Sequence, residues 1–390
     1  MTEIAHGAVV ALPGEAIVSR WWRTLDKGTL GAIVLLFAIG LLLGFAASVP
    51  LAERNGLQPF HYVYRQAAFG AMAFAVMLTI SMMSPQLVRR LGVVGFFFAA
   101  AALMALPVLG TDFGKGATRW YSLGFVALQP SEFLKPVFVV MTAWLMASAA
   151  EPGGPPGKSL SFAILMVIIA FLALQPDFGQ AMLTVVAWSA VYFVAGAPIV
   201  LLTVVVAAVA LVGFVAYENS EHFARRIDGF LSPEIDPRTQ MGYAIDAIRE
   251  GGILGTGVNE GRVKWILPDA HTDFIIAVAA EEYGLILVLL VVALFAFIAW
   301  RSMMRLCEER DAFIRLAGTG LAVLLASQAF INLGVAVRLL PAKGMTLPFV
   351  SYGGSSLIAM GALAGMLLCF TRERPQGNIG DHLLSRGAPR

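Results

Sequence analysis

Asp273 is the residue best placed to do chemistry, because it stands where a polar stretch meets a long apolar one. The chain reads WILPDAHTDF from Trp265 onward, and from Thr272 it is largely apolar as far as Trp300. A carboxylate at such a boundary can act as a general base, or it can cap the N-terminus of a helix. An asparagine variant separates the two roles, because asparagine caps a helix but is no base. His271 is expected to be a hydrogen-bonded positioning residue rather than a second base.

Glu281 and Glu282 lie inside the same apolar segment. A continuous helix from Thr272, at ~1.5 Å per residue, would place them about 12 to 14 Å below the membrane surface. A carboxylate near the bilayer centre costs at least ~2.5 kcal/mol unless it faces a polar cavity or a cation. The two glutamates are therefore expected in a polar environment near mid-depth, where a proton relay or a gate could use them.

Polar residues also gather in stretches that the hydropathy pattern assigns to the outer half of the membrane. The stretches are RWYSLGFVALQPSEFLK (119–135), LQPDFG (174–179), LPDAHTDF (267–274) and LPAKGMTLPFVSYGGSS (340–356). Their prolines break or begin helices, and the freed backbone groups can be satisfied only in a water-filled or protein-lined cavity. The sequence therefore predicts a cavity that opens outward.

Cationic side chains accompany these stretches and fit an anionic substrate. Arg119, Arg338 and Lys343 could stabilise a phosphate leaving group, or they could be snorkelling side chains that pair with nearby carboxylates. Glu132 and Lys135 lie at i, i+3 on one helix face, where an ion pair lowers the cost of holding either charge in a membrane. The candidate site residues are Asp273 as the catalytic base, with Arg119, Glu132, Lys135, Asp177, His271, Arg338, Lys343 and Ser351 as substrate-binding or cavity residues.

The elements that must position these residues are membrane-spanning helices. Of the 390 residues, 58% are hydrophobic and only 13% are charged, which excludes a soluble globular domain of this length. The apolar runs predict an all-α polytopic membrane protein with ten transmembrane helices and one long outer loop. The predicted spans are 29–48, 61–82, 92–109, 132–149, 160–174, 178–196, 198–216, 272–299, 313–338 and 352–371. No removable signal peptide is expected, so the first span should stay as an anchor.

Basic residues in the short loops set the expected orientation. Arg89, Arg90, Arg301 and Arg305 fall on one side, and the side richer in lysine and arginine is the cytoplasmic one. The resulting division of the chain is a cytoplasmic tail at 1–28, a membrane domain at 29–371 that includes a periplasmic loop at 217–271, and a cytoplasmic tail at 372–390.

The long loop contains one predicted helix. Apolar residues recur at helical spacing from Met241 to Ile248, which indicates an amphipathic helix on the membrane surface. Glycines follow it, and Gly255 and Gly257 are expected to form a pliable hinge.

The four polar stretches resemble the signatures of the SEDS family (shape, elongation, division and sporulation), and the similarity runs from residue 30 to residue 371. LPAKGMTLPFVSYGGSS and GRVKWILPDAHTDF are closer to the cell-division member than to the elongation member. The resemblance implies a ten-span peptidoglycan glycosyltransferase that extends glycan strands from lipid II. Carried over by position, the family's essential outer-loop aspartate falls on Asp273, and its fourth-span glutamate and lysine fall on Glu132 and Lys135.

The resemblance also implies partners and a location. The partners are lipid II and undecaprenyl-pyrophosphate-linked glycan, a class B penicillin-binding protein (the division transpeptidase) and other divisome proteins; nucleic acid is not expected. The location is the bacterial cytoplasmic (inner) membrane, with both termini in the cytoplasm, at the division septum. No cofactor is certain, although a divalent cation, Mg²⁺ or Mn²⁺, could assist the leaving group.

A second class of function is open, namely a flippase that moves the lipid-linked precursor across the membrane. A flippase is expected to line a path through both halves of the membrane, whereas the polar residues here cluster on one side. Glu281 and Glu282 are the residues that would serve such a path. A scaffold that only recruits division proteins would not need Asp273.

Overall fold

Helices make up almost all of the regular structure. The computed structural model describes residues 16–111, 118–122, 124, 126–219, 221–232, 236–341 and 344–374. Within these residues the only strands are β1 (Tyr121–Ser122) and β2 (Ala127–Leu128), which pair antiparallel. The predicted all-α class is therefore confirmed. Lys343 and the tail residues 1–15 and 375–390 lie outside the described residues.

Ten of the helices coincide with the ten predicted spans. They are α2 (Lys27–Arg54), α3 (His61–Met82), α4 (Pro85–Leu109), α5 (Pro130–Ser148), α6 (Gly157–Leu174), α7 (Phe178–Val194), α8 (Ile199–Asn219), α11 (Ile275–Cys307), α12 (Ala312–Ala336) and α13 (Gly354–Phe370). In the described part of the chain, seven of these are long and apolar enough to cross a membrane, and α7 and α13 are shorter apolar helices. The prediction of a polytopic membrane protein is confirmed.

The other helices are short. They are α1 (Ile17–Thr24), α9 (Glu221–Leu231), α10 (Gln240–Gly251) and the 3-10 helix η1 (Val263–Trp265). The helix predicted in the long loop is α10, but it packs against α11, and Ala244 and Ala247 on that face are fully buried. Its small residues let it contact protein closely on this face, and its position on the membrane surface stays a prediction.

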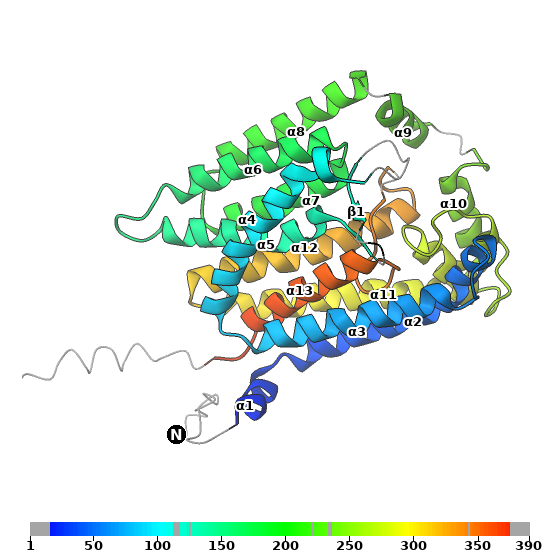
Figure 1. Cartoon of the computed structure of the whole chain (residues 1–390), viewed down its shortest axis with the longest axis horizontal. Helices are drawn as coiled ribbons and strands as arrows, with labels where there is room; N and C mark the ends of the chain where they lie inside the picture. The colour runs from blue at the N-terminus through cyan, green and yellow to red at the C-terminus, as the bar shows by residue number, and fades with distance from the viewer. Residues whose placement is uncertain are drawn as a thin grey trace, which may run out of the picture.

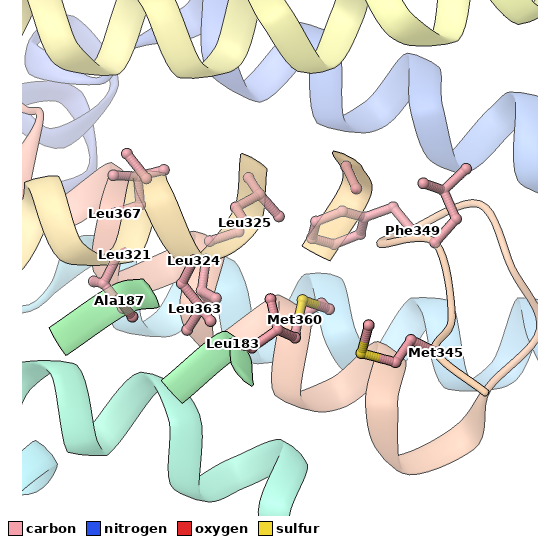
Figure 2. Close-up of a cluster of buried hydrophobic side chains, with 14 of the residues drawn as sticks. Leu183, Ala187, Leu321, Leu324, Leu325, Met345, Phe349, Met360, Leu363 and Leu367 are labelled. Carbon is pink, nitrogen blue, oxygen red and sulfur yellow. The ribbon is translucent and has the colours of Figure 1, made fainter. Parts of the chain in front are cut away.

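Helix α12 lies at the centre of the bundle (Figure 1). It packs against α5, α7, α11 and α13, and 72% of its apolar window is buried inside the protein, compared with 6% for α8 at the edge. Figure 2 shows the contacts of α12 with α7 and α13. The labelled side chains there include Leu183 and Ala187 of α7, Leu321, Leu324 and Leu325 of α12, and Leu363 and Leu367 of α13. In a membrane such contacts stabilise the bundle through van der Waals packing.

The loop between α12 and α13 folds back into the bundle. Met345, Leu347, Phe349 and Val350 are all buried. Gln66 of α3 donates from Nε2 to the carbonyl of Val350 (3.1 Å). Irregular backbone at membrane depth is tolerated only where it is buried in protein or lines a cavity, and this loop does both.

Helix α11 is interrupted at Gly284, whose φ of 74° and ψ of −175° are not helical. The apolar part of the segment after the break, from Leu285 to Trp300, is about 24 Å long at 1.5 Å per residue. Glu281 and Glu282 directly precede the break. The break lies after both glutamates and leaves their distance from Thr272 unchanged, so a relay or gate at mid-depth stays a prediction.

Gly284→Ala is expected to destabilise the protein. Its backbone conformation is one that essentially only glycine adopts, at a cost of ~1–3 kcal/mol for other residues, and a Cβ there would meet the backbone of Ile253 and Gly255. The melting temperature in detergent measures the effect. Gly31→Ala is the control, because Gly31 lies in α2 with open space around it. Equal melting temperatures for the two variants would contradict the role of Gly284.

Candidate active site

A cavity of about 600 Å³ lies between α3, α5 and the loops that precede α11 and α13. His271 is among its lining residues. Among the described residues, the charged ones in the lining are Arg65, Arg119, Glu132, Asp269 and Asp273. The structure thus brings four predicted site residues to one cavity, from stretches far apart in the sequence.

Asp273 lies in a turn directly before α11. Its amide donates to the carbonyl of Asp269 (3.1 Å), and a Cβ on Gly344 would lie 3.2 Å from the Asp273 carboxylate oxygen Oδ2. The N-cap residue of α11 is Phe274, whose own side chain makes no capping hydrogen bond. Asp273 lies one residue before this N-cap, so the capping alternative stays open, and its carboxylate lies beside Gly344 in the cavity lining.

Hydrogen bonds fix the backbone around Asp273. Asn332 of α12 donates from Nδ2 to the carbonyls of Asp273 (3.0 Å) and Met345 (2.6 Å). Ser351 donates from Oγ to the carbonyl of Thr272 (2.6 Å). Ser351 is not among the lining residues, but it holds the backbone next to Asp273. Together with Asn332 it joins the loop before α13 to the loop before α11.

His271 belongs to a group of aromatic rings at the cavity. Its ring centroid lies 5.9 Å from that of Tyr62 and 5.7 Å from that of Tyr352. The amide of Tyr352 donates to the carbonyl of His271 (3.0 Å). These contacts suit the expected positioning role, which stays a prediction.

Glu132 and Lys135 of α5 form a buried ion pair beside the cavity. Lys135 Nζ lies 2.8 Å from Glu132 Oε2. Lys135 also donates to Gln328 Oε1 of α12 (2.8 Å), and Gln180 of α7 donates from Nε2 to Glu132 Oε1 (2.5 Å). The pair predicted from the i, i+3 spacing therefore exists, and it joins three helices.

The amides of this network and one cation were missed by the sequence analysis. Gln180, Gln328 and Asn332 are buried, and amide side chains in apolar spans commonly bond across helices. Arg65 lines the cavity although it lies in an apolar span, where a charge marks a functional site by default. Both signals were present in the sequence, but neither says which residues meet.

Arg119 stands between the cavity and a second, apolar groove. It donates from Nε to the carbonyl of Gln175 (3.0 Å) and from Nη2 to that of Pro176 (2.8 Å). The groove, of about 220 Å³, is lined mainly by apolar side chains of α6, α7 and α8. Arg119 and Gly344 line both spaces. A polar cavity thus adjoins an apolar groove at the edge of the bundle.

Asp177 lines the groove rather than the cavity. It accepts from Gln129 Nε2 (3.1 Å), and Gln129 lines the cavity. Burial raises the pKa of Asp177 above its ordinary value, and the nearby Arg119 opposes that shift. Asp177 therefore belongs to the wall between the two spaces.

Arg338 lies outside the cavity lining. Its guanidinium donates to the carbonyls of Gly229 (3.4 Å), Phe230 (3.1 Å) and Ser232, at the end of α9. Cations commonly bond the carbonyls that a helix end leaves without partners. The structure therefore gives Arg338 a role in holding α9, and it does not bring this residue to Asp273. The expectation for Lys343 falls outside the described residues.

A divalent cation is one expectation for the site, and the described residues offer no preformed cage for it. Among them, no group of three or more His, Cys, Asp or Glu side chains could hold a metal ion. Protein-bound Mg²⁺ usually takes one or two carboxylates together with waters and substrate phosphates. A divalent cation at this site would therefore need water and substrate oxygens as further ligands.

Comparison with known proteins gives matches along most of the chain. The model of the cell cycle protein family FtsW/RodA/SpoVE matches residues 28–376. A probable peptidoglycan glycosyltransferase FtsW from Caulobacter vibrioides is 42% identical over 357 residues, which are 91% of each chain. A second, from Alkalilimnicola ehrlichii, is 36% identical and covers 92% of this chain and 95% of the relative.

Solved structures share the fold. A chain from a study of how a peptidoglycan synthase complex coordinates polymerization and crosslinking has a TM-score of 0.73 and 28% identity, covering 91% of this chain and all of that one. The rod shape determining protein RodA of Thermus thermophilus has a TM-score of 0.67 and 25% identity, covering 91% of this chain and 99% of that one. With the family match, these likenesses establish that this chain belongs to the FtsW/RodA/SpoVE family of cell cycle proteins.

Proposed function

We propose that this protein is a peptidoglycan glycosyltransferase of cell division, which polymerises lipid II into glycan strands at the outer face of the inner membrane. The observation that carries the proposal is the two-part site, in which the polar cavity that Asp273 lines adjoins an apolar groove at Arg119 and Gly344. Lipid II joins its sugars through a diphosphate to a long polyprenyl chain. Its two ends therefore need a polar and an apolar space side by side.

In the proposed reaction Asp273 acts as the general base. It takes the proton of an acceptor sugar hydroxyl, whose oxygen attacks the anomeric carbon of the donor while the bond to the diphosphate breaks. Negative charge develops on the leaving diphosphate. Within the part of the chain that the structure describes, Arg65 and Arg119 are the cations in the cavity lining, and cations aimed at developing charge lower the barrier.

The proposal includes partners. The similar chain named above comes from a peptidoglycan synthase complex, and we extend that association to this chain as pairing with a class B penicillin-binding protein among other divisome proteins. Relatives named FtsW support a place at the division septum.

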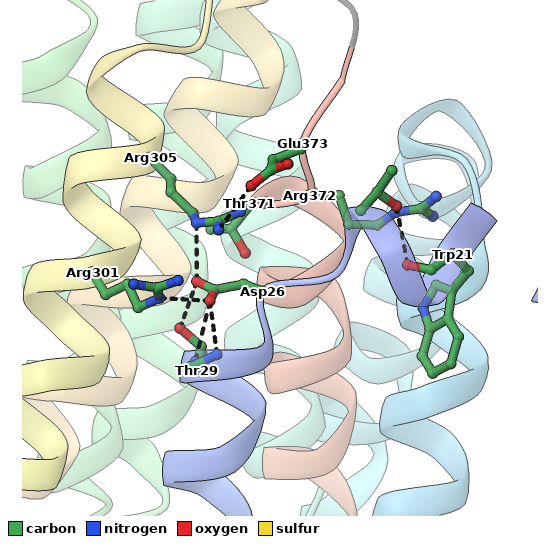
Figure 3. Close-up of polar contacts among 10 residues, drawn as sticks. Trp21, Asp26, Thr29, Arg301, Arg305, Thr371, Arg372 and Glu373 are labelled. Atoms are coloured by element: carbon green, nitrogen blue, oxygen red, sulfur yellow. Dashed lines mark hydrogen bonds and ion pairs between the residues drawn. The ribbon is translucent and has the colours of Figure 1, made fainter. Parts of the chain in front are cut away.

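The proposal also places both termini in the cytoplasm. Arg372 donates from Nε to Thr24 Oγ1 (3.1 Å), so the first and last described helices end on the same side. Asp26 on that side binds Arg301 Nε (2.6 Å) and Arg305 Nε (3.2 Å) (Figure 3). A concentration of basic residues supports a cytoplasmic face.

Lipid II polymerisation by the purified protein tests the proposal. The protein, with and without its partner transpeptidase, is incubated with lipid II, and the glycan products are separated by gel electrophoresis. The expected result is glycan strands. A flippase would instead move labelled lipid II across a liposome membrane. Translocation without any polymer, with the partner present, would overturn the glycosyltransferase proposal.

A further inference from the structure

Glu281 and Glu282, which the proposed reaction does not use, bind a segment of the long loop, residues 252–265, here named the bracket. Glu281 accepts from the backbone amides of Val263 (2.6 Å) and Lys264 (3.1 Å). Glu282 Oε1 lies 2.5 Å from Lys264 Nζ, and Lys264 Nζ also donates to Asn259 Oδ1 (2.9 Å). Lys264, Glu281 and Glu282 are each at most 2% exposed, so these contacts are sheltered from water.

The bracket also supplies hydrogen-bond partners that the break at Gly284 takes away from α11. Thr256 donates from its amide (2.8 Å) and from Oγ1 (2.9 Å) to the carbonyl of Glu281. The amide of Leu285 donates to the carbonyl of Gly252 (3.0 Å). Buried backbone groups require such partners. The bracket is thus hydrogen-bonded to the backbone of α11 at the break.

Gly255 fits this close packing rather than a hinge. Its φ is +86°, and a Cβ would collide with the backbone of Glu282 and Tyr283. Its amide donates to the carbonyl of Gly251 (2.8 Å). At Gly255 the structure therefore shows a close contact, where the lack of a side chain allows two backbones to approach, and the pliability expected of Gly257 stays a prediction.

The short helix 275–283 connects the bracket to Asp273. From Ile275 to Ala280 every side chain is at most 3% exposed, and the nine residues form a rod about 13 Å long. Asp273 lies just before one end of the rod, and Glu281 and Glu282 lie at the other. Because close-packed interiors transmit displacements, a shift at the bracket moves the turn that carries Asp273.

We propose that Lys264, Glu281 and Glu282 are positioning residues for glycosyl transfer. Their contacts fix the rod along its axis and thereby set the distance between the Asp273 carboxylate and the acceptor hydroxyl. The inference rests on the proposed function, because it assigns these residues to the same site. A carboxylate is needed at Glu281, since it accepts from two backbone amides at once, which an uncharged amide side chain cannot do as well.

The first test pairs Lys264→Met with Glu282→Gln, which removes both charges together. Either change alone leaves a buried charge without its partner, and that threatens folding. The second test is Glu281→Gln, which keeps size and shape. For each, kcat for lipid II polymerisation is expected to fall about tenfold to a hundredfold, as misplacement of a catalytic group does. When equal amounts of folded protein are compared, KM is expected to stay within about twofold of the wild-type value, since substrate binding is left intact.

Glu309→Gln with Arg374→Met is the matched control. Arg374 Nη1 lies 3.3 Å from Glu309 Oε2, on the same side as Asp26 and away from Asp273. Removing that pair is expected to leave kcat at the wild-type value. A structural role alone would lower the amount of folded protein in either double variant and leave kcat per folded molecule unchanged.

The outcomes separate the inference from the function on which it rests. A wild-type protein that makes no polymer with its partner would refute the proposed function itself. An active wild type whose bracket variants keep wild-type kcat, or lose no more than the Glu309 and Arg374 control, would refute only the positioning role. Should the Lys264 and Glu282 double variant fail to fold, Glu281→Gln decides, and Thr256→Val, which keeps all charges, is measured beside it with a smaller loss of kcat expected.

Discussion

Asp273→Asn is expected to abolish lipid II polymerisation in a protein that still folds and inserts. The substitution keeps the size of the side chain beside Gly344 but removes the group that accepts the proton. Loss of a general base lowers a rate about 10²- to 10⁴-fold, which takes the product below detection in a gel assay. Asparagine caps a helix about as well as aspartate, so a missing helix cap does not explain the loss. Glycan product per folded molecule is the measurement.

Asp246→Asn serves as the control for Asp273→Asn. Asp246 lies on α10, in the same long loop, and it does not line the cavity. The same chemical change there is expected to leave the rate as it is. Full polymerisation by a folded Asp273→Asn protein would remove Asp273 from the reaction and with it the central assignment of the site.

The spans could be predicted from sequence because their cause is local. An apolar run of sufficient length must form a helix in a membrane, since no water is present to satisfy its backbone. The break in α11 has no such local cause. Gly284 alone does not mark it, because glycine is frequent in membrane helices, and the groups that replace the lost hydrogen bonds come from the bracket, earlier in the chain. The break at Gly284 was therefore not predicted from the sequence.

The cavity could be predicted as a region but not as a set of partners. Arg119 and Arg338 look alike in the sequence, as cations beside polar stretches. Arg338 has a φ of +58° and bonds the end of α9, whereas Arg119 lines the cavity. Asn332 supports Asp273 through a contact between α12 and a distant loop. Such contacts depend on how helices pack, and no spacing along the chain records them.

Substitutions in the Glu132 and Lys135 pair are expected to have the second large effect on stability and polymerisation. The two single variants are expected to behave differently from the double variant. Lys135→Met leaves the Glu132 carboxylate buried and short of a cation, which costs ~3 to 5 kcal/mol in soluble cores. Glu132→Gln likewise leaves Lys135 with Gln328 as its remaining partner. Each single variant is therefore expected to lose both stability and polymerisation, measured as melting temperature and as product per folded molecule.

The double variant Glu132→Gln with Lys135→Met tells a catalytic pair from a structural one. It removes both charges, so no buried ion is left alone, and Gln180 can still donate to the amide oxygen at residue 132. The chief remaining cost is the Gln328 oxygen without its donor, ~1 to 3 kcal/mol, so most of the stability should return. Glu132 lines the same cavity as Asp273, and a neutral side chain changes the field in which the substrate reacts. Stability that returns without polymerisation would therefore place the pair in the reaction, and the return of both would reduce it to a contact between α5, α7 and α12.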